Sequence, residues 1–353
     1  MPGTLCIIMG LVLVLPATGP ADEVDDFIRA EMDRQNIPGL SLAIVRDGEV
    51  VKATGYGMAD RRRGIPATPE TVYRIASVSK QFIATGIMLL VQDDRLDLED
   101  SVTRYLDDAP AAWNGITIRH LLTHTAGLVR EAPGFTYSRA QPGGDVIRTA
   151  YDLPLRFKPG EEWEYSNLGY FVLAEIIRVV SRQPWTEFLT EQAFTPSGMA
   201  ATWPTNTTEP VPDLAQGYVD NDELRDAPDL PALRPSGAFL STVMDLAAWD
   251  ATLHTDRVLT AASRRQMWTP VTLNDGSSRP YGFGWQVGEL RDRRLVFHHG
   301  GMPGAHSTFA RFVDDGLTVI VLMNLNDSDI GAILNGVASI YLSSSMPAAF
   351  AAS

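Results

Sequence analysis

Hydrophobic and polar positions follow a helical period at the start of the chain and strand-like patterns directly after it. Apolar side chains recur at helical spacing over residues 22–36, which predicts an amphipathic helix that stops at Pro38-Gly39. Two apolar runs, 40–45 and 49–53, then flank Arg46-Asp47-Gly48. This arrangement is typical of a β-hairpin, because Asp-Gly suits the tight turn between two paired strands.

The C-terminal part of the chain returns to strand-like patterns after a middle region, 77–270, in which helical periods dominate. Strands at both chain ends with helices between them predict an α+β fold, in which one antiparallel sheet is built from both ends and a mostly helical region is inserted. No linker separates independent domains, so we expect one domain over 22–353, with its sheet part at 22–76 and 271–345. The C-terminal elements expected are strands at 284–287, 294–298, 308–313 and 317–323, and a helix at 330–342.

Composition narrows the class of protein. The chain has 353 residues, 45% of them hydrophobic, which is enough to bury the core of a large domain. Its formal net charge of −14 argues against a nucleic-acid partner, because such binding depends on Lys and Arg side chains that neutralise phosphates.

The first 21 residues carry no charged side chain and contain an apolar run at 5–16, followed by small residues. This pattern predicts a secretory signal segment, too short to span a bilayer, and hence a secreted or periplasmic bacterial protein without a membrane span after processing. No Lys or Arg precedes the run, so an anchor that stays in place is the alternative. Cys6, the single cysteine, lies inside the segment, and we expect a mature chain without disulfides.

A serine and a lysine three residues apart, Ser77 and Lys80, precede a strongly apolar run. Residues at this spacing are neighbours on a helix, and a lysine whose pKa is lowered by burial can accept the serine proton. Taken alone, S-x-x-K is also explained by a serine at a helix start followed by a surface lysine. A second motif, Y-x-N, places Tyr165 and Asn167 where a loop enters a predicted helix, and helix capping there is compatible with a role in a site.

A third motif, H-x-G, begins at His298 and includes Gly300. It follows a strand-like run and passes into glycines, which let a ligand approach the backbone closely. Without further context, paired histidines before glycines indicate a turn more often than a site.

The order of these motifs parallels that in penicillin-binding proteins and β-lactamases, with Y-x-N and H-x-G in place of S-D-N and K-T-G. Three further segments carry the same resemblance: L-L-T-H-T-A-G-L at 121–128, P-S-G-A-F-L-S-T at 235–242 and Y-G-F-G-W at 281–285. The chain resembles the class C β-lactamase-like serine hydrolases, which include D-aminopeptidases, D,D-peptidases, esterases and β-lactamases. The resemblance implies their fold, with the active site between the sheet and the helical part.

The resemblance also implies roles for the motif residues. Ser77 would attack a carbonyl carbon and form an acyl-enzyme, while Lys80 and Tyr165 handle the proton, and which of the two is the base in each step stays open. The oxyanion would be held by the backbone N–H groups of Ser77 and Gly301. Asn167 and His298 would contact the substrate.

The histidine at position 298 bears on the substrate. The family's K-T-G lysine is a cation that suits a substrate carboxylate, whereas a histidine with an ordinary pKa of about 6.5 is mostly neutral at pH 7. We therefore expect a small-molecule or short-peptide substrate cleaved at an ester or amide bond, as by an esterase or a D-amino-acid peptidase. The alternatives are a β-lactamase or D,D-carboxypeptidase, and a penicillin-recognising protein with poor turnover. The oligomeric state stays open.

Other chemistry has little support in the sequence. His120 and His124 have a spacing that could bind zinc, but Leu121 stands where H-E-x-x-H needs its glutamate, and a structural role is expected. No G-x-S-x-G elbow, P-loop or dinucleotide-binding glycine motif occurs, so we expect no cofactor and no metal.

Overall fold

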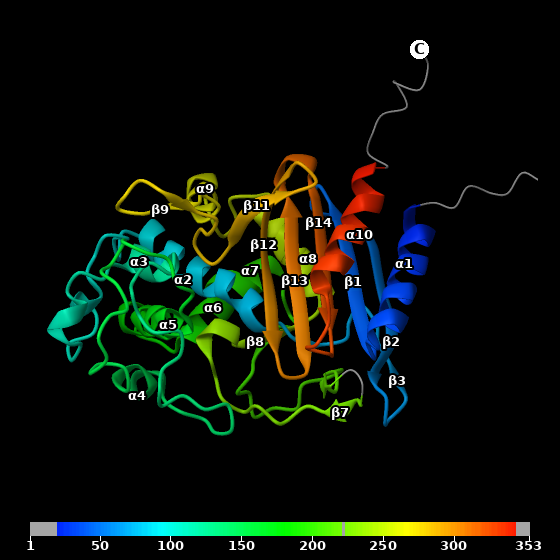
Figure 1. The fold of residues 1–353 in the computed structure, drawn as a ribbon, viewed down its shortest axis with the longest axis horizontal. Helices are drawn as coiled ribbons and strands as arrows, with labels where there is room; N and C mark the ends of the chain where they lie inside the picture. The colour runs from blue at the N-terminus through cyan, green and yellow to red at the C-terminus, as the bar shows by residue number, and fades with distance from the viewer. Residues whose placement is uncertain (1–19, 221–222, 344–353) are drawn as a thin grey trace, which may run out of the picture.

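The computed structural model describes residues 20–220 and 223–343. A seven-stranded antiparallel sheet brings together both ends of the chain, in the order β11-β12-β13-β14-β1-β2-β3 (Figure 1). Its strands are β1 (Gly39–Arg46), β2 (Glu49–Asp60), β3 (Ile65–Pro66), β11 (Gln286–Leu290), β12 (Arg293–Met302), β13 (Ala305–Phe312) and β14 (Leu317–Met323).

The N- and C-terminal parts of the chain meet where β1 pairs with β14. The register sets Ala43 opposite Ile320, and every residue of both strands except Arg46 is buried. Strands covered on both faces read as continuous apolar runs, because neither face is in contact with water.

Two helical layers cover the sheet. Helices α1 (Pro20–Gln35) and α10 (Ile330–Ser343) lie on one face, where Ile28 and Val337 belong to the same buried cluster as sheet residues such as Val321 (Figure 1). Helix α8 (Val243–Leu253) packs against β1, β2 and β14 on the other face, and α2 (Lys80–Gln92) and α5 (Asn167–Ser181) pack against each other in the helical region.

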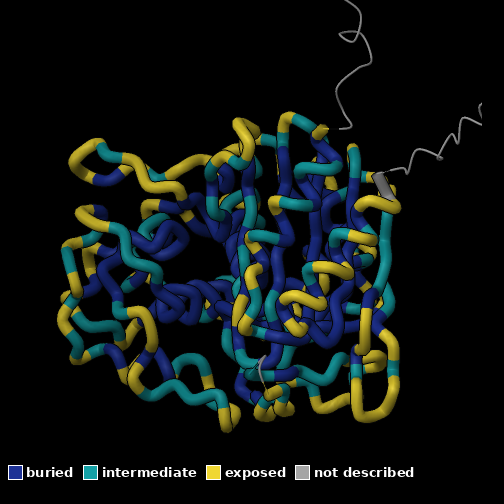
Figure 2. The backbone as a smooth tube through the Cα atoms, turned by 45° about the vertical axis from the view of Figure 1, so that its right-hand side comes forward, coloured by how far each residue is buried: buried dark blue, intermediate teal, exposed yellow. Residues whose placement is uncertain are grey.

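One large apolar core runs from that face of the sheet into the helical region, through residues such as Val45, Phe82, Phe171 and Trp249 (Figure 2). It therefore crosses the expected borders between sheet part and helical part. The remaining helices are α3 (Ile118–Leu122), α4 (Gly143–Arg148), α6 (Trp185–Leu189), α7 (Thr195–Ser197) and α9 (Ala261–Met267), with the short helical turns η1 (Ala76–Ser79), η2 (Val102–Arg104), η3 (Ala111–Trp113), η4 (Thr190–Phe194), η5 (Pro235–Gly237) and η6 (Val313–Asp315). The short strands are β4 (Tyr73–Arg74), β5 (Trp203–Pro204), β6 (Tyr218–Val219), β7 (Arg225–Asp226), β8 (Phe239–Ser241), β9 (Val271–Thr272) and β10 (Ser278–Arg279).

The predicted α+β architecture, with one sheet built from both chain ends, is confirmed. The strand expected at 284–287 instead begins at Gln286, because Gly284 has a φ of +75° and lies in a bend. The predicted signal segment, Cys6 included, falls outside the described residues, except for Pro20 and Ala21, which begin α1. Within 20–220 and 223–343, none of the helices is both long and apolar enough to cross a bilayer.

A buried ion pair fixes α8 to the sheet. Arg311 on β13 donates from Nε to Asp250 Oδ1 at 2.6 Å, and Thr318 on β14 donates to the same oxygen at 2.7 Å. The Asp250 side chain is fully buried and that of Arg311 is 5% exposed. Nearby Arg311 holds the pKa of Asp250 below its usual 3.8 although burial opposes this. The pair therefore stabilises the fold above about pH 4 and loses that effect as the pH falls further.

Asp250→Ala should lower the free energy of unfolding by about 3–5 kcal/mol, because it leaves a buried guanidinium without its carboxylate. Urea unfolding at pH 7 measures this change. Asp256→Ala, which breaks an ion pair whose carboxylate is 66% exposed, is the control and should change stability little. Equal effects of the two substitutions would contradict the structural importance of the Asp250 pair.

Candidate active site

Ser77 lies in the short turn η1, directly before α2. The preceding residue, Ala76, has a φ of +44°, a left-handed conformation that costs a non-glycine residue about 1–2 kcal/mol. Ala76 is held there by a small apolar cluster with Leu230, Met302 and Ala305. The Ser77 side chain stays partly accessible while its neighbours are buried, as a nucleophile requires.

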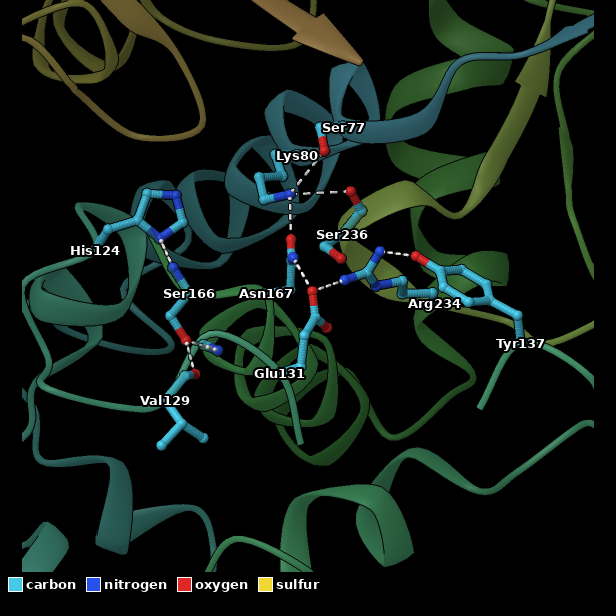
Figure 3. A network of polar contacts seen from close by, with 11 residues as sticks. Ser77, Lys80, His124, Val129, Glu131, Tyr137, Ser166, Asn167, Arg234 and Ser236 are labelled. Carbon is cyan, nitrogen blue, oxygen red and sulfur yellow. Dashed lines mark hydrogen bonds and ion pairs between the residues drawn. The ribbon is translucent and has the colours of Figure 1, made fainter. Parts of the chain in front are cut away.

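The amine of Lys80 is fully buried and makes three polar contacts (Figure 3). Its Nζ lies 3.2 Å from Ser77 Oγ, 2.9 Å from Asn167 Oδ1 and 3.0 Å from the Ser236 carbonyl oxygen. Burial lowers the pKa of Lys80 well below its usual value of 10.5, and the nearby Arg234 guanidinium lowers it further. The alternative of a capping serine followed by a surface lysine is therefore wrong for this S-x-x-K.

Tyr165 faces the same pair. Its ring centroid is 4.6 Å from Lys80 Nζ, and its phenol is near enough to the Ser77 side chain for that side chain to influence the phenol's pKa. Burial raises the pKa of Tyr165 to about 12, although the contact with Ser77 opposes the shift. The hydroxyl, amine and phenol that the motifs supply thus converge, and the phenol carries its proton at neutral pH.

The segment at 121–128 positions the Y-x-N loop. His124, with a φ of +61°, lies past the end of α3, and its Nδ1 accepts the Ser166 backbone N–H at 3.1 Å. The His124 carbonyl accepts the Glu164 N–H at 3.0 Å, and the His124 ring lies 4.3 Å from the Tyr165 ring. Ser166 caps α5 by accepting the Gly169 N–H, so the capping interpretation of this motif and its place in the site hold together.

The two histidines of the zinc-like spacing have separate structural tasks. His120 completes a capping box with Thr117 at the start of α3, whereas His124 holds the loop after it. Within the part of the chain that the structure describes, His, Cys, Asp and Glu form no group of three suited to a metal ion.

A charged network extends from Asn167 toward the surface (Figure 3). Asn167 Nδ2 donates to Glu131 Oε1 at 2.5 Å, Glu131 is paired with Arg234, and Arg234 is hydrogen-bonded to Tyr137. Arg130 is exposed, with its guanidinium 5.1 Å from the Tyr165 ring. No motif contains Glu131, Arg234, Tyr137 or Arg130, so the sequence alone did not point to them.

The H-x-G residues lie inside a strand and not in a turn. Strand β12 continues to Met302, and its glycines run alongside the Ser77 turn. A Cβ at Gly300 would stand 2.4 Å from the Ile75 carbonyl oxygen and 2.9 Å from Ser77 N. Only a glycine at position 300 therefore allows β12 to lie this close to Ser77. At Gly301 the nearest atom to such a Cβ, Asn326 Oδ1, would be 3.2 Å away.

His298 is 1% exposed, and both its ring nitrogens are in contact with other groups. Its Nδ1 lies 2.6 Å from the His299 carbonyl oxygen, which fixes Nδ1 as the donor, so Nε2 accepts from the Tyr281 hydroxyl at 3.0 Å. Burial lowers the pKa of His298 to about 3, so the ring is neutral at pH 7. Both ring nitrogens of His298 are therefore already bonded within the protein. Its direct contact with a substrate stays a prediction.

A pocket of about 250 Å³ opens beside the phenol. Trp163, Tyr165, Pro280, Tyr281 and Gln286 line it. Its walls are largely aromatic, which suits an apolar group of a substrate.

Comparison with known proteins agrees with this geometry. The profile of the family described as Beta-lactamase matches residues 24–338. The chain belongs to the beta-lactamase family. Penicillin-binding protein 4* of Bacillus subtilis is 32% identical over 83% of this chain and 69% of its own length, and protein flp of Staphylococcus aureus is 30% identical over 86% and 63%. The D-amino acid amidase of Ochrobactrum anthropi, complexed with L-phenylalanine amide, superposes with a TM-score of 0.81 at 25% identity, over 92% of this chain and 99% of its own.

The predicted resemblance to class C β-lactamase-like serine hydrolases is therefore confirmed, as is the fold that it implied. The relatives of this fold are serine hydrolases, and the chain is an enzyme of that kind. It spans about two thirds of the length of the two bacterial relatives named above.

Gly300→Ala should reduce activity at least about 100-fold, because its Cβ must push β12 away from Ser77 and misplacement of reacting groups has costs of this size. Gly301→Ala is the matched control. It keeps the backbone N–H and meets only a side-chain atom at 3.2 Å, so it should retain most activity. Hydrolysis of a nitrophenyl ester measures both. Similar losses in the two variants would contradict the steric argument.

Proposed function

We propose that this protein hydrolyses amide or ester bonds of small acyl compounds through a covalent intermediate on Ser77. The observation that carries the proposal is the buried Lys80 amine, held by Ser77, Asn167 and the Ser236 carbonyl. Such an amine can act as a base at neutral pH, because burial disfavours its charged form.

The contacts of Lys80 support the role of base in acylation for this residue. A neutral amine has two hydrogens and one lone pair. Asn167 Oδ1 and the Ser236 carbonyl are acceptors and take the two hydrogens, which leaves the lone pair for the Ser77 proton. As that proton moves to Nζ, Ser77 Oγ forms a bond to the substrate carbonyl carbon.

Tyr165 has the complementary role of proton donor. Its phenol, with a pKa of about 12, is protonated and in contact with Ser77. It passes a proton to the departing nitrogen or oxygen as the tetrahedral intermediate collapses, and the proton on Lys80 replaces it. Water then attacks the acyl-enzyme by the reverse sequence of proton transfers. The N–H groups of Ser77 and Gly301 would hold the oxyanion in both steps.

The charges around the site are mixed, and each sign favours a different class of substrate. Glu131 is 42% exposed beside Asn167, and a carboxylate there attracts the ammonium group of an amino acid amide or ester. The structural similarity to a D-amino acid amidase supports such substrates. One observation favours a second candidate, a hydrolase of carboxylate-bearing compounds such as β-lactams, because exposed Arg130 is a cation next to Tyr165.

We expect the protein to cleave a short-chain nitrophenyl ester and a D-alanyl anilide, and to act slowly or not at all on a chromogenic cephalosporin. Ser77→Ala should remove all three activities, since no other residue supplies the nucleophile. Steady-state rates at pH 7.5, with electrospray mass spectrometry of the intact protein for the acyl adduct, measure these outcomes. Ser278→Ala, at an exposed serine of β10, is the matched control and should remain active.

Cephalosporin turnover as fast as ester turnover would favour the second candidate. A stoichiometric burst without steady turnover on all three substrates would instead indicate a penicillin-recognising protein. Ester cleavage that persists in Ser77→Ala would contradict the mechanism.

The role of Lys80 predicts an acid limb in the pH profile of kcat/KM. Activity should fall about tenfold for each pH unit once the pH drops below the lowered pKa of Lys80, because the protonated amine has no lone pair. His298 does not produce this limb, because its pKa of about 3 lies below the pH range of the assay. Ester hydrolysis between pH 4 and pH 9, corrected with Ser77→Ala, measures the limb.

Arg130→Gln sharpens this test, because Arg130 is exposed and its positive charge lowers the pKa of Lys80. Its removal should raise that pKa and move the acid limb to higher pH. Glu131 acts in the opposite direction, so Glu131→Gln should move the limb to lower pH. A limb that stays in place in both variants would show that another group titrates.

A further inference from the structure

A second cavity, of about 310 Å³, is lined in part by the turn between β12 and β13 and by the segment that follows β7. Figure 1 shows that this turn and β7 lie at the same end of the sheet. Arg74 on β4 and Gln216, Asp229, Gly304 and Asn324 are among its lining residues. None of Ser77, Lys80, Tyr165 or Asn167 lines it. Its volume is at the lower end of the range for small-molecule sites, about 300–1,000 Å³.

Arg74 is the unusual residue of this cavity. Its side chain is half-buried, and its Nη1 is buried without a hydrogen-bond partner. Among residues 20–220 and 223–343, no carboxylate lies within 4.0 Å of the guanidinium, although the charge of Asp229 acts on it from farther away. Burial lowers the pKa of Arg74, because the charged form is less well solvated there than in water.

The other polar groups of the cavity have a different character. Asn324 is 1% exposed, and its Nδ2 donates to the Met58 carbonyl oxygen at 3.0 Å while its Oδ1 has no partner. Asp229 is exposed at the cavity. Among the described residues, the cavity thus combines a guanidinium that has no carboxylate in contact with it, the Asp229 carboxylate and an unsatisfied amide oxygen.

We propose that this cavity binds a small zwitterion of the free amino acid class. Its carboxylate would pair with the Arg74 guanidinium, whose planar donors suit a carboxylate. Its ammonium group would face Asp229, with Asn324 Oδ1 adding negative potential from the wall. A simple anion would leave Asp229 opposed to it, and a simple cation would leave Arg74 without a partner.

The position of the cavity links it to the catalytic segments. Arg74 precedes Ser77 by three residues, through the strained Ala76. Gly304 belongs to the turn that follows β12, the strand that carries Gly300. A ligand here therefore contacts both segments that build the Ser77 side of the site, without entering it.

Alanine is the probe, used as both enantiomers with the full-length Ser77→Ala protein, so that no turnover is involved. Calorimetric titration should show binding of alanine, and acetate and ethylamine should bind at least tenfold more weakly. Arg74→Gln should weaken alanine binding at least tenfold. Asp229→Asn, at an exposed position that leaves folding intact, should weaken alanine binding and leave acetate unchanged. Arg265→Gln, at an exposed arginine of α9, is the matched control and should bind as before.

Absence of binding by either enantiomer would overturn the proposal, as would acetate binding equal to that of alanine. Binding that survives Arg74→Gln and Asp229→Asn but is lost in Glu131→Gln would place the amino acid in the catalytic cleft and also refute it. The readout is binding by a variant without the nucleophile, so it is independent of the proposed hydrolytic activity.

Discussion

The site depends on one constraint, which is that the Lys80 amine is enclosed by neutral oxygen atoms and, among the residues that the structure describes, is in contact with no carboxylate. A contacting carboxylate would keep the lysine charged, because opposite charges favour the ionised form. The nearest acidic side chain of the network, Glu131, contacts Asn167 and Arg234 instead. The amide therefore separates the carboxylate from the amine, and Arg234 offsets much of its charge. The same low polarity that lowers the pKa of Lys80 raises that of Tyr165.

The surrounding fold maintains this arrangement from three directions. Pairing of β1 with β14 closes the sheet, and β12 lies at a distance from the Ser77 turn that only glycine at position 300 permits. From the helical part, the His124 ring accepts the N–H of Ser166. This bond fixes the loop in which Tyr165 and Asn167 flank Ser166. The shared apolar core makes these parts one rigid unit, which is why a site between them can hold distances near 3 Å.

Much of this arrangement could be predicted because the motifs are local. The spacing of Ser77 and Lys80 brings them together on any helical turn, and the apolar run after them indicated burial. The junction at Ser166 was recognisable as a helix start. By contrast, Glu131 and Arg234 are 103 residues apart and meet only through folding. The extension of β12 beyond His298, through Gly300 to Met302, was also missed, because glycines ordinarily interrupt a strand pattern and here serve a close backbone contact.

The amino-acid sequence by itself determined the α+β class and the closing strands, and it supplied the candidates for the nucleophile, lysine and phenol, since these follow from residue type and short-range spacing. Only the tertiary structure decided the charge states of Lys80, Tyr165 and His298, because a pKa depends on burial and on charges brought close by distant segments. It alone also left Nη1 of Arg74, at the wall of a cavity, without a hydrogen-bond partner among the described residues. Sequence specifies which groups are present, and packing decides which of them are in contact with water.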